Sequence, residues 1–217
     1  MTRKTLAARF WASLYAVSTL YRPTRWINNR FFSAVPDAYQ IRAHGDRRML
    51  ALAEAARVHI GPCESILDVT VCEGLTLQRV AQVLKVRCLA GLDLSDIALD
   101  RARTRLDEGR FQRFDLMLLY RDPTVEVPLA PADLVLVCEC LYCVGPMASL
   151  LWKYPSLQNR RKKQLVEGLR KCARKGVLFQ HFGERQRHGI GAIVESCGGR
   201  LVNERWGIYY LPAFPRT

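Results

Sequence analysis

A short polar turn separates the first buried strand expected in this chain from the helix that follows it. The strand and turn read Ile66-Leu67-Asp68-Val69-Thr70-Val71-Cys72-Glu73-Gly74, and a second acid, Asp93, follows nineteen residues after Gly74. Such a turn lets the backbone approach a ligand at a helix N-terminus, and an acid about twenty residues on accepts hydrogen bonds from ribose hydroxyls. The spacing therefore predicts a nucleoside-binding site.

The elements that must position this turn alternate along the chain as strands and helices. The pattern predicts a helix that begins at Asp46 and ends before Gly61-Pro62. An α/β, Rossmann-like, doubly wound sheet follows, mostly parallel, with about seven strands and a C-terminal antiparallel hairpin. Residues 1–45 form an N-terminal helical cap or extension, and residues 46–217 form the sheet domain. The expected strands are 65–69, 88–92, 116–120, 133–140, 176–180, 200–206 and 208–211, and the expected helices between them are 76–84, 95–106, 157–174 and 189–197.

Two segments together resemble a known family. The 66–74 turn resembles the motif of class I S-adenosylmethionine-dependent methyltransferases, usually V-L-D-x-G-x-G-x-G, and residues 133–142 (DLVLVCECLY) resemble the fourth strand of that family, often D-L-V-x-x-x-E-x-L-Y. The E-x-L-Y pattern is similar to that of small-molecule N-methyltransferases of the nodulation type. The resemblance covers about residues 46–211 and implies methyl transfer to an amine or hydroxyl of a small-molecule acceptor.

The resemblance implies S-adenosyl-L-methionine as the cofactor and assigns residues to it. Asp68 would help to hold the ammonium end, Asp93 would bind the ribose, and Asp122, just after the expected strand at 116–120, would contact the adenine. The alternative for Asp68 and Asp122 is an ordinary cap or turn residue. The other residues that the resemblance places beside the cofactor are Thr70, Cys72, Gly74, Leu94 and Cys138.

The chain departs from the family at two motif glycines, which are here Thr70 and Cys72. Glycine lets the backbone lie close to a ligand and adopt angles that a side chain disfavours. Two outcomes follow from this departure. Either cofactor binding is altered and weakened, or the chain is a non-catalytic protein that keeps the methyltransferase fold.

Three residues near the ligand edge of the sheet are candidates for catalysis. Methyl transfer requires alignment of acceptor and methyl group, and a base only when the acceptor must lose a proton. Glu139 would orient or deprotonate an amine, His181 would serve as a base, and Tyr142 follows Glu139 at the same edge. The structural alternatives are aromatic packing for Tyr142 and a loop histidine for His181.

The chain has eight cysteines, several of them inside apolar strand-like runs, which favours free buried thiols and a reduced, cytoplasmic protein. The closely spaced Cys138, Cys140 and Cys143 lack a matching Cys or His pair at zinc spacing. We therefore expect no metal site.

The net charge of +13 is unevenly distributed. Residues 61–150 carry 9 basic and 13 acidic residues, whereas residues 1–60 carry 10 and 3, and residues 151–217 carry 14 and 4. The acidic middle suits a cationic cofactor, and the basic flanks favour an acidic acceptor or partner. Two alternatives are an RNA substrate for the basic run Arg160-Arg161-Lys162-Lys163 and a peripheral membrane contact through a basic amphipathic N-terminal helix.

Overall fold

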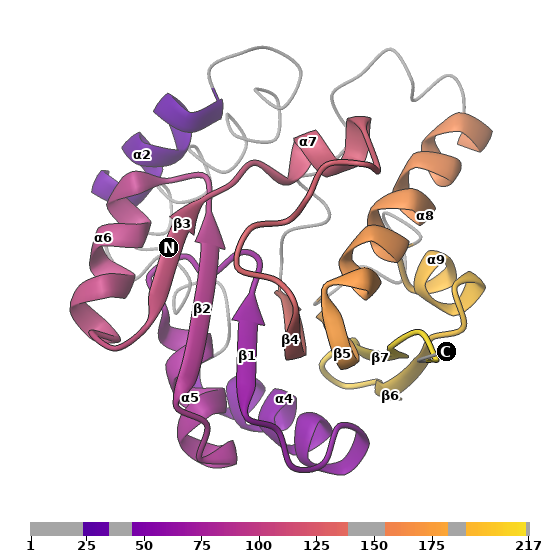
Figure 1. The fold of residues 1–217 in the computed structure, drawn as a ribbon, viewed down its shortest axis with the longest axis horizontal. Helices are drawn as coiled ribbons and strands as arrows, with labels where there is room; N and C mark the ends of the chain where they lie inside the picture. The colour runs from indigo at the N-terminus through magenta and orange to yellow at the C-terminus, as the bar shows by residue number, and fades with distance from the viewer. Residues whose placement is uncertain (1–23, 35–44, 139–154, 182–189, 216–217) are drawn as a thin grey trace.

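The computed structural model describes residues 24–34, 45–138, 155–181 and 190–215. In this part of the chain, seven strands form one sheet in the order β3-β2-β1-β4-β5-β7-β6 (Figure 1). The strands are β1 (Ser65–Asp68), β2 (Cys88–Asp93), β3 (Arg110–Arg113), β4 (Ala132–Cys138), β5 (Ala173–Gln180), β6 (Arg200–Asn203) and β7 (Ile208–Pro212).

The first five strands run parallel, and β7 inserts antiparallel between β5 and β6. The fold class predicted from the sequence, including the C-terminal antiparallel pair, is confirmed. All seven residues of the central strand β4 are buried. Burial on both faces explains why the sequence of this strand is continuously apolar rather than alternating.

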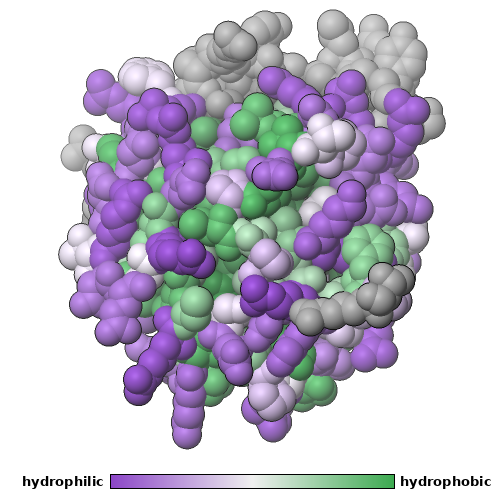
Figure 2. Space-filling model, in the orientation of Figure 1, coloured by the Kyte–Doolittle hydropathy of each residue, from purple (hydrophilic) through white to green (hydrophobic). Residues whose placement is uncertain are grey.

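Helices cover both faces of the sheet, and each face has its own hydrophobic core. One core joins alternate strand residues such as Ile66 and Leu134 to α4 (Asp46–His59), α5 (Leu75–Leu84) and α6 (Asp96–Arg105). The other core joins residues such as Leu67 and Val135 to α7 (Leu116–Arg121), α8 (Pro155–Lys171) and α9 (Ile190–Ser196). Neighbouring residues of β1 therefore face opposite layers, as strand geometry requires. In Figure 2, hydrophobic residues gather toward the middle of the viewed face, and hydrophilic residues surround them.

One expected element is wrong. Residues 116–120 form the helix α7 and not a strand, and the third strand is the short β3 at 110–113. Asp115 caps the N-terminus of this helix, because its Oδ1 accepts a hydrogen bond from the Met117 amide at 2.9 Å. Leu116, Leu119 and Tyr120 are buried at helical spacing. A short apolar run has no periodicity that separates strand from helix, so tertiary packing decided between them.

The helix α2 (Thr24–Ala34) comes from the N-terminal segment and lies against α6 (Figure 1). Phe31 and Phe32 are buried with Ala98 in a small third core, and their rings meet edge to face with centroids 5.1 Å apart. The division into residues 1–45 and 46–217 stays a prediction. Among the described residues, no helix is both long enough and apolar enough to span a bilayer.

Candidate functional site

The turn that the sequence singled out lies where the strand order reverses. The chain passes from β1 to β2 on one side, while β4 pairs with β1 on the other side. The Thr70 hydroxyl bridges this point by donating a hydrogen bond to the Cys138 carbonyl at 3.2 Å. Ligands of open α/β sheets bind outside the carboxyl ends of the strands at such a reversal. The expected position of the site is therefore the position that the fold favours.

Asp68 is the last residue of β1, and only 1% of it is exposed. Its Oδ1 accepts a hydrogen bond from the Thr70 amide at 3.1 Å. Burial raises the pKa of Asp68 to about 7, with a further increase from the charge of Asp93 and an opposing effect from Arg48. The site thus holds a carboxyl group whose charge is costly until a cation approaches.

Arg48 was missed by the sequence reasoning. It lies on α4, is 2% exposed and is close enough to Asp68 to lower the pKa of that carboxyl. Arg48 stands one residue before Met49 and one helical turn before Leu52, both of which are buried. The position of Arg48 on the apolar side of the expected helix could have identified it, because a buried arginine needs a polar partner inside the protein.

Asp93 ends β2 and is also buried. Its Oδ1 accepts a hydrogen bond from the Ser95 amide at 2.8 Å, and its Oδ2 accepts one from the Cys72 amide at 3.0 Å. Burial raises the pKa of Asp93 to about 6, while the hydrogen bonds from the Ser95 and Cys72 amides act in the opposite direction. Asp93 therefore joins the turn after β1 to the start of α6.

The two positions where the chain departs from the glycine motif behave differently. Cys72 has φ 50°, in the left-handed region, whereas Thr70 is not among the described residues with positive φ. A residue with a Cβ is strained in the left-handed region, so Cys72 and not Thr70 occupies the position that demands glycine. Gly74 keeps φ 81°, and a Cβ there would lie 3.3 Å from Leu106 Cδ1.

Glu73 connects the same turn to α6 through an ion pair and a hydrogen bond. Its side chain has no exposed surface and forms an ion pair with Arg101. Its carbonyl accepts a hydrogen bond from Arg105 Nε at 2.9 Å. Arg101 also donates to the Phe32 carbonyl of α2 at 2.8 Å. The turn is thereby held between β1, α6 and α2.

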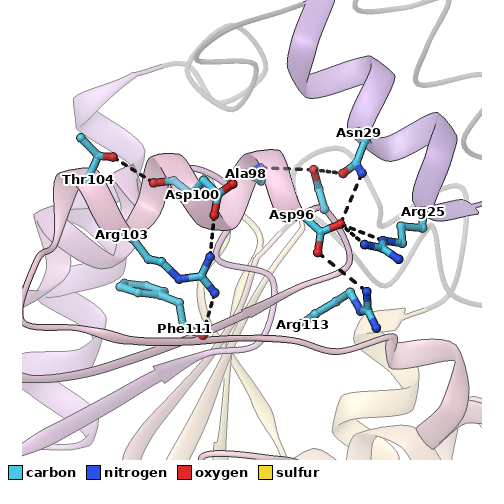
Figure 3. A network of polar contacts seen from close by, with 10 residues as sticks. Arg25, Asn29, Asp96, Ala98, Asp100, Arg103, Thr104, Phe111 and Arg113 are labelled. Carbon is cyan, nitrogen blue, oxygen red and sulfur yellow. Dashed lines mark hydrogen bonds and ion pairs between the residues drawn. The ribbon is translucent and has the colours of Figure 1, made fainter.

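The helix α2 contacts the start of α6 through polar side chains (Figure 3). Arg25 and Asn29 both point toward Asp96, with Arg25 Nε 2.7 Å and Asn29 Nδ2 3.4 Å from Asp96 Oδ2. Asn29 Oδ1 accepts a hydrogen bond from the Ser95 hydroxyl at 2.7 Å. Ser95 is therefore shared between α2 and the carboxylate of Asp93.

The expected place of Asp122 at a strand end is wrong, because Asp122 lies at the C-terminal end of α7. It is exposed, and its Oδ1 accepts hydrogen bonds from the Thr124 hydroxyl and amide, which lower its pKa. The acid that follows the true third strand is Asp115, two residues beyond Arg113, which pairs with Asp93 in the sheet. Because the third strand lies earlier in the chain than expected, the acid that follows it is Asp115, seven positions before Asp122.

Other expected site residues lie at the same edge of the sheet. Leu94 directly follows β2 and is half-buried, and Cys138 ends β4 and is buried. His181 directly follows β5 and is 3% exposed, and its amide donates to the Gly207 carbonyl at 3.1 Å. Glu139 and Tyr142 lie outside the described residues. Within the part of the chain that the structure describes, no group of three or more His, Cys, Asp or Glu side chains is placed to hold a metal ion.

A scan against protein-family models and a search of curated proteins found no match. Solved structures do resemble the chain. The N-methyltransferase NodS from Bradyrhizobium japonicum WM9, in complex with S-adenosyl-L-homocysteine, is 13% identical with a TM-score of 0.56, over 85% of this chain and 96% of NodS. An O-methyltransferase family protein from Burkholderia thailandensis is 12% identical with a TM-score of 0.63, over 97% of this chain and 71% of that protein. Together with the strand order, these likenesses establish that the chain has the fold of the class I S-adenosylmethionine-dependent methyltransferases.

Proposed function

We propose that the protein is a methyltransferase that uses S-adenosyl-L-methionine. The observation that carries this proposal is the pair of buried carboxyl groups, Asp68 and Asp93, at the ends of adjacent parallel strands on either side of a left-handed turn. Burial raises the pKa of both groups, so both favour a ligand that brings positive charge or hydroxyl donors. A nucleoside that carries an ammonium and a sulfonium group has both features.

The residues of the turn fit this ligand. Asp93 is held by backbone amides at the end of β2, where a carboxylate can accept hydrogen bonds from ribose hydroxyls. Asp68 lies across the turn and, with Arg48 behind it, would hold the charged amino-acid end. The cofactor supplies, when bound, a methyl group made electrophilic by the adjoining sulfonium.

For the adenine end we propose Asp115 in place of Asp122. Asp115 follows β3, the strand next to β2, and the amide of the intervening Phe114 donates to the Asp93 carbonyl at 2.9 Å. Asp115 is half-buried and already accepts one amide hydrogen bond, so its second oxygen can accept an amino group. Asp122 is occupied by Thr124 on the surface.

We further propose a small-molecule acceptor that is methylated on an amine or a hydroxyl. One structural neighbour is described as an N-methyltransferase and the other as a member of an O-methyltransferase family. We propose His181, which directly follows β5 and is buried, as the base that removes a proton from the acceptor. The roles of Glu139 and Tyr142 stay predictions. Acidity of the acceptor also stays a prediction, based on the basic flanks of the sequence.

A cytoplasmic location belongs to the same proposal. The six cysteines that the structure describes are free thiols, and three of them are buried. Thiols of this kind suit a reducing compartment.

Isothermal titration calorimetry with S-adenosyl-L-methionine and S-adenosyl-L-homocysteine tests the cofactor directly. We expect binding of both, at micromolar or weaker affinity because of the altered turn, and at least tenfold weaker binding by Asp93→Ala. Incubation with a panel of small amines and phenols, followed by detection of S-adenosyl-L-homocysteine, tests the acceptor. Asp93→Ala binding as tightly as the wild type would contradict the ribose assignment, and no binding by any form would contradict the function.

A further inference from the structure

Both oxygens of the Asp93 carboxylate are held by residues that the helix α2 contacts. Oδ1 accepts a hydrogen bond from the Ser95 amide at 2.8 Å, and Oδ2 accepts one from the Cys72 amide at 3.0 Å. We propose that Asn29 of α2 is a positioning residue for ribose binding, which acts through Ser95 to hold the Asp93 carboxylate in its binding orientation. This inference rests on the proposed function, since it concerns how the same site receives its nucleoside.

The hydrogen bond between Ser95 and Asn29 carries the first step of the argument. The Ser95 hydroxyl donates to Asn29 Oδ1 at 2.7 Å and accepts from the Ala98 amide at 3.2 Å. Ser95 is buried, and a hydroxyl has a single proton to donate. A buried donor that loses its acceptor is costly, so without Asn29 the residue shifts toward another acceptor. The Ser95 amide, which holds Asp93 Oδ1, shifts with it.

The side-chain amide of Asn29 is itself held at the start of α6, which carries the second step (Figure 3). Its Nδ2 donates to Asp96 Oδ2 at 3.4 Å. Arg25, which lies one helical turn earlier, donates to the same oxygen through Nε at 2.7 Å. An ionised carboxylate only accepts hydrogen bonds, so the amide nitrogen of Asn29 faces Asp96 and the amide oxygen faces Ser95. The acceptor for the Ser95 hydroxyl therefore has a fixed direction.

The same helix supports the other oxygen of Asp93, which carries the third step. Cys72, whose amide binds Oδ2, packs against the small third core, to which α2 contributes Phe31 and Phe32. The helix thus contacts the residue behind each carboxylate oxygen. A carboxylate whose two oxygens are already oriented needs little rearrangement when it accepts the ribose hydroxyls, and this preorganisation increases affinity.

Three substitutions on α2 separate the positioning role from a general effect on folding. Asn29→Ala removes the acceptor of the Ser95 hydroxyl, whereas Asn29→Asp keeps an oxygen there, with Arg25 nearby to offset the added charge. Arg25→Ala is the matched control, because it breaks the exposed ion pair with Asp96 on the same helix and leaves Ser95 with its acceptor. Melting temperatures of all forms report folding independently of ligand.

The first readout is the dissociation constant for S-adenosyl-L-homocysteine by calorimetry. We expect it to increase about three- to tenfold in Asn29→Ala, and to stay within about twofold of the wild type in Asn29→Asp and Arg25→Ala. A 2′,3′-dideoxyribose analogue of the same ligand should bind the wild type and Asn29→Ala alike, because that ribose donates nothing to Asp93.

The second readout needs no ligand. Hydrogen exchange of single amides, followed by NMR, reports how firmly the Asp93 carboxylate holds its donors. We expect the Ser95 and Cys72 amides to exchange about threefold faster or more in Asn29→Ala, and at the wild-type rate in Arg25→Ala. The Cys72 amide is the sharper probe, because the hydrogen bonds that the structure describes lead from Asn29 to Cys72 by way of Ser95 and Asp93.

The outcomes distinguish this inference from the function on which it rests. Wild-type affinity in Asn29→Ala, with or without faster exchange, or an equal loss of affinity in Arg25→Ala, would overturn the positioning role and leave the function intact. Faster exchange in Asn29→Ala, together with absence of binding by the wild type, would support Asn29 as the residue that orients Asp93 and contradict the function. Absence of both effects would overturn both proposals.

Discussion

Ser95 donates a hydrogen bond through its hydroxyl to Asn29 Oδ1 at 2.7 Å, which links two residues that are 66 positions apart. The same hydroxyl accepts a hydrogen bond from the Ala98 amide at 3.2 Å and so caps α6. The Ser95 amide donates a hydrogen bond to Asp93 Oδ1 at 2.8 Å. A single residue thus connects α2, the N-terminus of α6 and the carboxylate that we assign to the ribose.

Ser95→Ala should therefore destabilise the protein through its cap and through its link to α2. Loss of an N-cap costs about 1 kcal/mol, which corresponds to a melting temperature about 2–4 °C lower for a chain of this size. Asn29→Ala leaves the cap intact and removes the link to Ser95 together with the longer hydrogen bond to Asp96. In a denaturant-unfolding cycle, we expect the double variant to lose less stability than the sum of the two single variants by about 0.5–1 kcal/mol. Strict additivity would show that the hydrogen bond to Asn29 contributes no stability.

Asp68→Asn should stabilise the folded protein at neutral pH. The pKa of Asp68 is about 7 in the folded protein, and an unfolded Asp has a value near 3.9. The folded state therefore binds the proton more tightly, so the wild type loses stability as pH rises from about 4 to about 7. Asn keeps the oxygen that accepts from Thr70 and removes the charge.

Melting curves at pH 4.5, 6 and 7.5 measure this effect. We expect the melting temperature of Asp68→Asn to exceed that of the wild type by several degrees at pH 7.5 and by little at pH 4.5. Asp122→Asn is the control, because hydrogen bonds from Thr124 lower the pKa of this exposed carboxyl, and no gain should appear. A difference for Asp68→Asn that does not depend on pH would contradict the titration of Asp68.

Cofactor affinity should rise with pH over the same range. A cationic ligand favours the ionised form of Asp68, whose pKa is about 7, and Asp93, whose pKa is about 6, must be ionised to accept two hydroxyl donors. Binding below pH 7 therefore takes place with release of protons. Calorimetry in buffers of different ionisation enthalpy, between pH 5.5 and 8, measures the protons released.

We expect the dissociation constant for S-adenosyl-L-methionine to fall about tenfold between pH 5.5 and 7.5 and then to level off. Asp68→Asn should flatten the upper part of this profile. If the affinity of the wild type were constant across the range, the two carboxyl groups would not be contacting the ligand.

Asp115→Asn should weaken cofactor binding more than Asp122→Asn does. Asn is a good helix N-cap, so this substitution keeps the start of α7 intact while it changes the charge and the acceptor pattern of the side chain. We expect the dissociation constant for S-adenosyl-L-homocysteine to increase about three- to tenfold in Asp115→Asn, and to stay within twofold of the wild type in Asp122→Asn. The reverse order would return the adenine contact to Asp122.

Most of the fold follows from local patterns in the sequence. Ser95 as the cap of α6, the apolar phase of α5 and the buried run of β4 each depend on residues close together in the chain, and the structure has all three. The strand expected at 116–120 failed for the same reason, because a five-residue apolar run carries no period. The acid that follows this run, Asp122, was therefore expected at the end of a strand and lies instead at the end of a helix.

The sequence by itself determined most of the strands and helices and the turn after Asp68, because hydrophobic periodicity and motif spacing are local properties. Tertiary structure alone decided which groups meet at that turn. Arg48 lies beside Asp68, and the amide of Cys72 meets Asp93, because the parallel register places β2 next to β1 and α4 packs against that layer. These contacts join residues about twenty positions apart, and no local pattern records them.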